Sequence, residues 1–370
     1  MKLYIKIALG IVCLSGSIQL KAQDANLIVG TYTQKGSKGI YLFHFDTATG
    51  KAVELSHTDN VINPSFLAIT KDKQYVYAVN ETSEGAVSAF SLKNNHLQFI
   101  NQVPTKGADP CYISIAPDQK NIFVANYSGG SISQFYKFAD GSISKLRQHI
   151  QHKGSSIHPD RQKSAHVHGS FISPDGHYLL TPDLGMDQVF IYPFSTTKNP
   201  PLDIDKSTSI KSQAGAGPRH LCFSKNGRYL YILEELSGNI AVYQFQKGNA
   251  QLIQTIAAHP EPFKTQAGSA DIHMSPNGKY VYVSNRGEEN NLVKLNVLPD
   301  GKLDGQTKQY TSTQGIKPRN FTISADGKWL LVANQDSDNI VVFKINPNNG
   351  ELIPTNSSIK LSMPVCLVLF

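Results

Sequence analysis

Short β-type runs of apolar residues recur along the chain, and each follows a polar turn. The turns carry Asp or Asn, often followed by Gly, at positions 72, 118, 175, 226, 277 and 326. The runs after them span residues 75–80, 122–126, 178–180, 229–233, 280–285 and 329–334, and they end near Asn or Glu. A period of 46 to 57 residues between turns is typical of a β-propeller, in which each repeat forms one blade.

A second amphipathic run sets the number of blades. It occurs seven times, at 40–43, 87–90, 132–135, 189–192, 240–243, 292–295 and 340–343. The first run occurs only six times, so the missing inner strands must come from the chain ends, at 27–32 and 364–370. We predict an all-β, seven-bladed β-propeller closed by N- and C-terminal strands that share one blade. Such closure covers strand edges that would otherwise promote aggregation.

The first 22 residues have the pattern of a secretory signal peptide. Lys2 and Lys6 precede an apolar stretch at 7–20, and Ala22 is a small residue before an expected cleavage site. The stretch is too short for a membrane-spanning anchor. We expect residues 1–22 to be a signal peptide and 23–370 to be one propeller domain. The mature protein would then be periplasmic or extracellular and free of the membrane.

Charge and cysteine content exclude several classes of protein. The net charge is +7, and loss of residues 1–22, which hold three lysines and no acidic residue, lowers it to +4. No Lys/Arg tract alternates with aromatic residues, so nucleic acid is not an expected partner. Cys111, Cys222 and Cys366 lie in predicted strands and should be buried thiols. No metal-ligand spacing appears and no cofactor is expected, although backbone carbonyls could bind a divalent ion.

Polar residues interrupt the apolar repeats at equivalent places. His168, Arg219 and Arg319 stand at or just before the start of a first inner strand, where other repeats carry residues such as Phe66 and Ile113.

Two more polar residues, Glu235 and Arg286, stand at the far end of a second inner strand. The two inner strands are antiparallel, and the Asp-Gly turn joins them at the opposite face. The start of one strand and the end of the other therefore meet at the same mouth of the central channel. We predict that all five polar side chains converge there.

Five segments resemble those of a known family. They are residues 166–170 (HVHGS), 217–221 (GPRHL), 234–236 (EEL), 284–287 (SNRG) and 317–321 (KPRNF). Together with the Tyr-Val-x-x-Asn repeats, they resemble the lactonase family of seven-bladed propellers. That family includes the propeller-type 6-phosphogluconolactonase and carboxy-cis,cis-muconate cyclase. The resemblance covers the whole mature chain, and a single Trp argues against WD, kelch and quinone-enzyme propellers.

The resemblance implies a catalytic set of His168, Glu235, Arg219 and Arg286. Lactone hydrolysis needs a base that activates water and a positive group that holds the developing oxyanion. Glu235 is the expected base if burial raises its pKa against the pull of nearby arginines, and His168 is the next proton carrier. Arg219 and Arg286 would bind the oxyanion or a substrate carboxylate. The further candidates for substrate binding are Arg319, His166, Asp271 and Gln335.

The chain differs from the family pattern at three positions, and several of the assigned residues also have a structural interpretation. Asp271 replaces a longer acid, Asn320 replaces a histidine, and Glu234 adds a second acid that strand alternation places on the opposite face from Glu235. The two Pro-Arg arginines could be clamps between blades that pair with acids such as Asp271. His166 and His168 could be structural, and Glu235 could be only an ion-pair partner of Arg286. The insertion at 150–164 could be a lid or a solvated loop.

Three functions compete at this point. The resemblance implies an exported lactonase acting on a small anionic or sugar-lactone substrate. Because phosphorylated sugar lactones are cytosolic metabolites, export favours a non-phosphorylated lactone. A muconate-type lactonizing cycloisomerase would use the same groups in the ring-forming direction. A non-catalytic binding or scaffold propeller would have no reason to gather these charges at one mouth.

Overall fold

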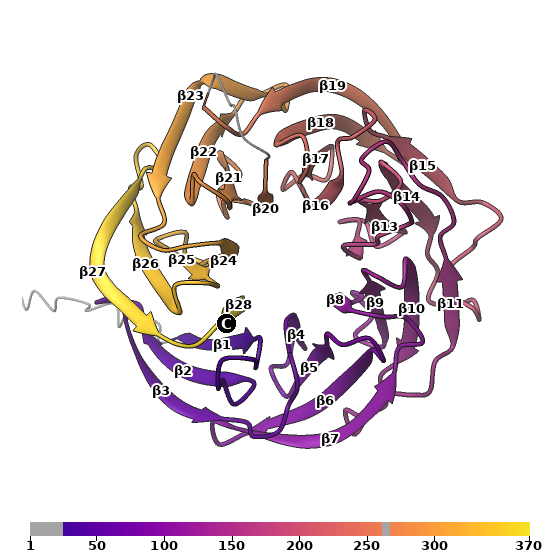
Figure 1. Cartoon of the computed structure of the whole chain (residues 1–370), viewed down its shortest axis with the longest axis horizontal. Helices are drawn as coiled ribbons and strands as arrows, with labels where there is room; N and C mark the ends of the chain where they lie inside the picture. Colours follow the sequence, from indigo (N-terminus) through magenta and orange to yellow (C-terminus); the bar gives the residue numbers. More distant parts are fainter. Residues whose placement is uncertain (1–24, 261–266) are drawn as a thin grey trace, which may run out of the picture.

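The computed structural model describes residues 25–260 and 267–370, so the predicted signal peptide lies outside the described residues. In this part of the chain, 28 strands form seven four-stranded antiparallel sheets around a central axis (Figure 1). The predicted all-β, seven-bladed propeller is confirmed. Within the described ranges, no helix is long and apolar enough to cross a bilayer.

The blades follow one another around the ring, each with its innermost strand given first. Blade 1 holds β28 (Pro364–Leu369), β1 (Ala25–Thr31), β2 (Tyr41–Asp46) and β3 (Lys51–His57). Blade 2 holds β4 (Leu67–Ile69), β5 (Tyr75–Asn80), β6 (Ala86–Lys93) and β7 (His96–Pro104). Blade 3 holds β8 (Pro110–Ile115), β9 (Asn121–Asn126), β10 (Ser131–Tyr136) and β11 (Gln148–Gln151).

The remaining four blades have the same order. Blade 4 holds β12 (Phe171–Ile172), β13 (Tyr178–Asp183), β14 (Gln188–Pro193) and β15 (Thr208–Lys211). Blade 5 holds β16 (Pro218–Phe223), β17 (Tyr229–Glu234), β18 (Asn239–Gln246) and β19 (Asn249–Ala257). Blade 6 holds β20 (Ser269–Met274), β21 (Tyr280–Asn285), β22 (Asn291–Val297) and β23 (Leu303–Ser312). Blade 7 holds β24 (Pro318–Ile323), β25 (Trp329–Asn334), β26 (Asn339–Ile345) and β27 (Leu352–Lys360).

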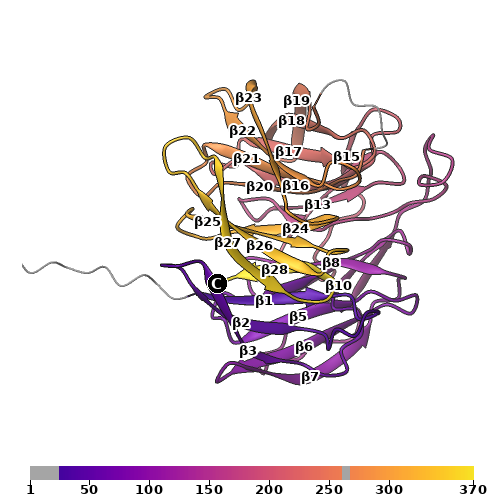
Figure 2. The ribbon, with the colours of Figure 1, turned by 60° about the vertical axis from the view of Figure 1, so that its left-hand side comes forward.

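Blade 1 closes the ring with both ends of the domain, as predicted. The C-terminal strand β28 pairs with β1 from Leu27↔Leu369 to Gly30↔Cys366, and Figure 2 shows the two strands side by side. This pairing gives both inner strands of blade 1 a hydrogen-bonded partner within the described residues.

The polar turns of the repeat fix the hairpin that joins the two inner strands. In blade 5, the Ser224 hydroxyl donates to Asn226 Oδ1 at 2.7 Å, and Gly227 adopts a φ of +70°. The same arrangement occurs in blades 4, 6 and 7. A left-handed φ at this position favours Gly, which explains the recurring Asp-Gly and Asn-Gly pairs. These turns hold the inner strands in register on the face opposite the site.

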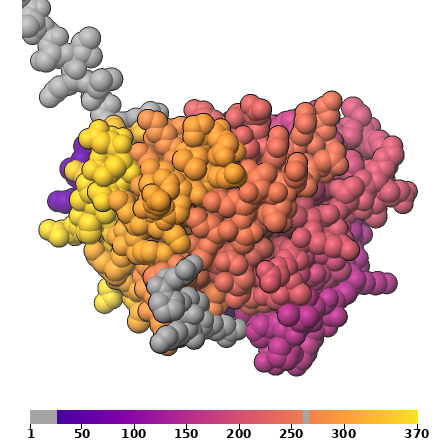
Figure 3. Space-filling view, turned by 90° about the horizontal axis from the view of Figure 1, so that it is seen from above, coloured from indigo at the N-terminus to yellow at the C-terminus, as the bar shows by residue number. Residues whose placement is uncertain are grey.

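Neighbouring blades are locked together by an aromatic ring that packs under a glycine. Gly50 of blade 1 lies against Trp329 of blade 7, and a Cβ at Gly50 would come within 2.5 Å of that ring. The Trp329 indole N–H also donates to the Thr47 carbonyl at 2.9 Å. Tyr75, Tyr178, Tyr229 and Tyr280 make equivalent contacts with a glycine of the following blade. Figure 3 shows one edge of the ring, where the blades that face the viewer form a continuous surface.

Candidate active site

One residue of each blade occupies an equivalent place at the channel mouth, directly after the second strand. Its backbone N–H donates to a carbonyl just before the innermost strand of the same blade; in blade 5, Glu235 donates to Gly217 at 2.7 Å. We call this the mouth position. Its occupants, from blade 1 to blade 7, are Tyr32, Glu81, Tyr127, Leu184, Glu235, Arg286 and Gln335.

A second equivalent place lies two residues after that carbonyl, and we call it the bulge position. In blades 1, 3, 5, 6 and 7 the pairing with the second strand shifts there by one residue. A β-bulge of this kind re-aims a side chain. From blade 1 to blade 7, its occupants are Val365, Ser65, Cys111, His168, Arg219, Ala270 and Arg319.

This register places His168, Arg219 and Arg319 at equivalent points of blades 4, 5 and 7. Phe66 and Ile113, expected near these points in other blades, lie one and two residues after the equivalent residues, which are Ser65 and Cys111. Because of the bulge, the residue that occupies the bulge position lies one or two residues earlier in the sequence than strand alternation alone would suggest.

The mouth and bulge positions enclose a pocket of about 180 Å³. Its lining consists of Tyr32, Glu81, Cys111, Tyr127, Arg161, His168, Glu235, Arg286 and Arg319. Four of the five residues predicted to converge therefore line one pocket. The fifth, Arg219, lies beneath Glu235 and is only 1% exposed.

Glu235 is the centre of an ion-pair cluster. Its Oε1 accepts a hydrogen bond from Arg161 Nη2 at 2.8 Å. Its Oε2 lies 2.8 Å from Arg219 Nε and 3.0 Å from Arg286 Nη2. The contact with Arg219 is close, but it is not aligned as a hydrogen bond. Both carboxylate oxygens are thus occupied by arginines.

The arginines decide the charge state of Glu235. Burial alone would raise its pKa, but Arg286, Arg219 and Arg161 together hold the pKa well below the usual range. A carboxylate with a depressed pKa is a weak base. Glu235 therefore lacks the raised pKa that a general base at this position would require.

Arg219 contacts other protein groups on every side. Its Nη1 donates to the Ala270 carbonyl and lies 3.4 Å from His220 Nε2. Burial and the neighbouring Arg286 lower the pKa of Arg219 to about 10, so the guanidinium stays charged at neutral pH. It can orient Glu235, but it has no surface with which to hold a substrate directly.

Arg161 is the main residue that sequence reasoning missed. It belongs to the insertion predicted at 150–164, of which residues 150–151 form the end of β11, and its Nη2 also donates to the Tyr127 hydroxyl at 3.0 Å. The adjacent Gln162 is fully buried and donates to the Leu184 carbonyl and to Asp187 Oδ1. The insertion therefore delivers a fixed arginine to the pocket.

The same Asp187 ties the insertion to blade 5. Its Oδ1 and Oδ2 also accept the N–H groups of Gly217 and Gly215, each at 2.7 Å. One carboxylate thus positions the segment that carries Arg161 and the strand that carries Arg219.

His168 is buried and uncharged at neutral pH. Burial, Arg219, His220 and Arg319 together hold its pKa well below the usual range. Its Nδ1 lies 3.6 Å from the thiol of Cys111. Burial raises the pKa of that thiol, so Cys111 is not a thiolate nucleophile. The three cysteines among the described residues are free, and Cys111 lines the pocket whereas Cys222 and Cys366 do not.

A second carboxylate, Glu81, lines the pocket at the mouth position of blade 2. Its Oε1 accepts a hydrogen bond from the Tyr32 hydroxyl at 2.8 Å and lies 3.9 Å from Arg319 Nη2. Its Oε2 is buried and has no hydrogen-bond partner among the described residues. Arg319 also stacks over the Tyr32 ring, with 5.4 Å to the centroid.

Three predicted binding residues lie outside the pocket lining. The buried Asp271 carboxylate accepts from His220 Nδ1 at 2.8 Å and from Asn320 Nδ2 at 2.6 Å, which joins blades 5, 6 and 7. His166 stacks on Tyr127 with ring centroids 4.5 Å apart. The Gln335 side chain donates to Asp336 at 3.0 Å. In these contacts Asp271 is paired with His220 and Asn320, whereas the clamp interpretation paired it with a Pro-Arg arginine.

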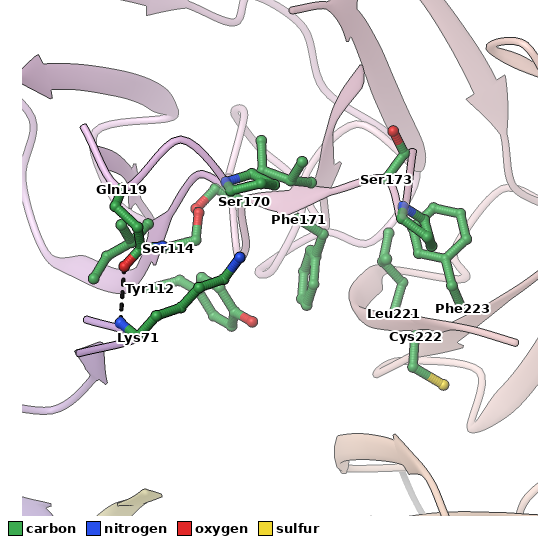
Figure 4. Close-up of a pocket in the computed structure, with 14 residues that line it drawn as sticks. Lys71, Tyr112, Ser114, Gln119, Ser170, Phe171, Ser173, Leu221, Cys222 and Phe223 are labelled. Carbon is green, nitrogen blue, oxygen red and sulfur yellow. Dashed lines mark hydrogen bonds between the residues drawn. The ribbon is translucent and has the colours of Figure 1, made fainter. Parts of the chain in front are cut away.

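A larger cavity of about 420 Å³ lies at the other ends of β8, β12 and β16 (Figure 4). Tyr112 and Phe171 line it and pack against His220, which in turn contacts His168 at 5.4 Å between ring centroids. Lys71 is the one charged residue among those that line it. Of these two pockets, only the smaller one gathers several charged side chains. Among the described residues, no His, Cys, Asp and Glu side chains are grouped to hold a metal ion.

The fold and pocket agree with comparisons to known proteins. The family model described as "Lactonase, 7-bladed beta-propeller" matches residues 26–369, and the chain belongs to this family. A 6-phosphogluconolactonase of Formosa agariphila is 36% identical over 88% of this chain and 94% of its own length.

Two solved structures are similar in sequence and in shape. The periplasmic gluconolactonase PpgL of Pseudomonas aeruginosa is 36% identical, with a TM-score of 0.88 over 94% of this chain and 99% of its own. A putative 6-phosphogluconolactonase of Bacteroides fragilis is 39% identical, with a TM-score of 0.87 over 96% and 99%.

Proposed function

We propose that this protein is an exported lactonase that hydrolyses a sugar lactone. The observation that carries the proposal is the convergence of Glu235, Arg161, Arg286 and His168 with Glu81 and Arg319 on one small pocket. A purely structural propeller gains nothing from such a cluster, because gathering buried charges costs free energy. Relatives named as lactonases align with 88% and 94% of this chain.

The arginines that reach the pocket supply the electrostatic part of the chemistry. Attack of water on a lactone carbonyl places negative charge on the carbonyl oxygen, and guanidinium groups that are already oriented stabilise that charge. Arg286 and Arg161 line the pocket and are held by Glu235. Glu235 is thus proposed to orient the arginines, and Arg219 to orient Glu235 from beneath. His168 is proposed to hydrogen-bond the substrate as a neutral imidazole.

The substrate is proposed to be a non-phosphorylated aldonolactone. Four arginines against two carboxylates give the site an excess of positive charge, which suits a polarised carbonyl and the carboxylate product. The signal-peptide pattern at residues 1–22 and the similarity to a periplasmic gluconolactonase both favour a substrate found outside the cytoplasm.

The test is a lactone panel assayed with purified residues 23–370. The panel contains glucono-δ-lactone, 6-phosphoglucono-δ-lactone and a muconolactone, and proton release is followed with a pH indicator after subtraction of spontaneous hydrolysis. We expect turnover of glucono-δ-lactone with a higher kcat/KM than for the phosphorylated lactone. Absence of turnover on every lactone would refute the enzymatic proposal, and turnover of muconolactone alone would favour the cycloisomerase. Export is tested separately, by locating the full-length protein in cell fractions.

A further inference from the structure

We propose that Glu81 is the general base of this site, the group that takes the proton from the water attacking the lactone. This inference rests on the proposed lactonase function and extends it. It concerns a carboxylate that the sequence motifs did not mark, on the opposite side of the pocket from the arginine cluster.

The place of Glu81 in the ring makes it the counterpart of Glu235. Both occupy the mouth position, Glu81 in blade 2 and Glu235 in blade 5, three blades apart in a ring of seven. Two carboxylates therefore approach the same pocket from opposite arcs of the mouth. A substrate whose carbonyl oxygen is held by the arginines around Glu235 would present its carbonyl carbon toward the Glu81 side.

The Glu81 backbone is held rigidly. Its N–H donates to the Asn63 carbonyl at 3.0 Å, and its own carbonyl accepts from Asn63 Nδ2 at 3.1 Å. The Asn63 side chain also accepts from the Thr33 N–H at 3.0 Å. A base must be positioned within hydrogen-bond reach of its water, and the two hydrogen bonds between Glu81 and Asn63 fix the backbone that carries this side chain.

The Glu81 side chain has one oxygen with a hydrogen-bond partner and one buried oxygen without a partner among the described residues. Tyr32 holds Oε1 at 2.8 Å. Oε2 is buried within the pocket region and has no partner among the described residues. A buried carboxylate oxygen without a partner is costly, so native structures rarely keep one without a role. We assign the missing partner of this oxygen to the attacking water, which would donate a hydrogen bond to it.

The other candidates for the base are less suited. Both oxygens of Glu235 face arginines at 3.0 Å or less. His168 has a strongly lowered pKa because of burial and the surrounding arginines. The charged and titratable groups around Glu81 itself are Tyr32, Arg319 and Cys111, of which only Arg319 is charged at neutral pH.

Water attacks the carbonyl carbon, a new C–O bond forms, and one water proton passes to Glu81 Oε2. The tetrahedral oxyanion is held by Arg286 and Arg161. When it collapses, the bond from carbon to the ring oxygen breaks, and Glu81 returns the proton to that oxygen. The product is the open hydroxy acid, which loses its carboxyl proton to solvent.

The test compares Glu81→Gln and Glu81→Ala with the control Glu84→Gln, an exposed acid on the same loop. We expect kcat on glucono-δ-lactone to fall about 10²- to 10⁴-fold in both Glu81 variants, as is typical for loss of a general base. The acidic limb of the pH–rate profile should disappear in Glu81→Gln. Added formate should restore part of the activity of Glu81→Ala, which a merely structural defect would not allow. The control should match wild type.

The outcomes separate this inference from the lactonase proposal. If the wild type turns over no lactone, the lactonase proposal fails. If the wild type is active and Glu81→Gln keeps more than about one tenth of its kcat, the base assignment is overturned and the lactonase stands. An inactive Glu81→Ala that formate does not rescue also overturns the assignment, whether or not that variant melts at the wild-type temperature.

Discussion

The two sides of the pocket mouth carry the same residue at the same backbone position in different surroundings. Glu235 is 5% exposed and has three arginines within 3.0 Å, whereas Glu81 is 16% exposed and has a tyrosine hydroxyl at 2.8 Å and one arginine at 3.9 Å. Surroundings, and not residue type, assign the roles of paired carboxylates in an active site. The crowded side is suited to holding charge, and the open side to moving a proton.

Replacing the acid on the crowded side should have the largest effect on stability. Glu235→Gln leaves Arg219 and its neighbours without a counter-charge in a buried site, and breaking a buried ion pair costs about 3–5 kcal/mol. We expect the free energy of unfolding in urea to fall by that amount and lactone turnover to be lost. Glu81→Gln should cost about 1 kcal/mol or less. Equal losses in the two variants would contradict the division of roles.

The positive potential of the crowded side should also appear in the pH dependence of stability. The pKa of His168 is lowered in the folded protein, so the unfolded chain binds its proton first as pH falls below about 6.5. His168 therefore destabilises the folded state at acid pH, by no more than about 2 kcal/mol at pH 5, the limit that the unfolded pKa of about 6.5 sets. Replacement by Gln should remove this loss when unfolding is measured at pH 7 and pH 5.

Two comparisons make that measurement specific. His177→Gln, at an exposed histidine, should leave the pH dependence as it is in the wild type. The low pKa of Glu235 stabilises the folded state above the ordinary carboxyl range, and this contribution is lost only as pH falls through the folded pKa, well below pH 5. A His168→Gln protein that loses as much stability as the wild type between pH 7 and 5 would show that the histidine is not held neutral.

The sequence predicted the blades and part of the site because both follow the repeat. Polar turns with a period near 50 residues specify hairpins, and topology then brings Glu235, Arg286, His168 and Arg319 to one mouth. Glu81, Tyr32 and Tyr127 share the mouth position, directly after each repeat's closing strand. The sequence carries that signal, but these residues do not differ from ordinary strand ends in residue type or in a distinctive motif.

Other features could not be derived from the repeat. Arg161 lies in an insertion, which has no counterpart in other blades and hence no register. The burial of Arg219 beneath Glu235 depends on a bulge and on packing against blade 6. The pKa of Glu235 depends on how far burial is offset by three arginines, and this depends on distances that a sequence does not contain.

Removing the arginine of the insertion should weaken substrate binding on the crowded side. Arg161 is 36% exposed at its side chain, so Arg161→Met should change stability by less than about 1 kcal/mol. We expect kcat/KM for the lactone to fall about tenfold, through a higher KM and a lower kcat, because Arg161 would hold the carbonyl oxygen before and during attack and a lost charge-assisted hydrogen bond is worth about 1.5 kcal/mol. Lys163→Met, an exposed neighbour on the same insertion, is the matched control. Unchanged kinetics in Arg161→Met would mean that the insertion only covers the mouth.

The smallest effect should come from the hydroxyl that supports Glu81. Tyr32→Phe removes the hydrogen bond to Oε1 but keeps the ring over which Arg319 stacks. We expect kcat to fall about fivefold, because a hydrogen bond of this kind contributes roughly 1 kcal/mol, while KM stays near the wild-type value. Tyr127→Phe, at the same backbone position on the crowded side, removes a partner of Arg161 and should raise KM instead. If both variants changed the same kinetic constant, the two sides of the mouth would not divide binding from proton transfer.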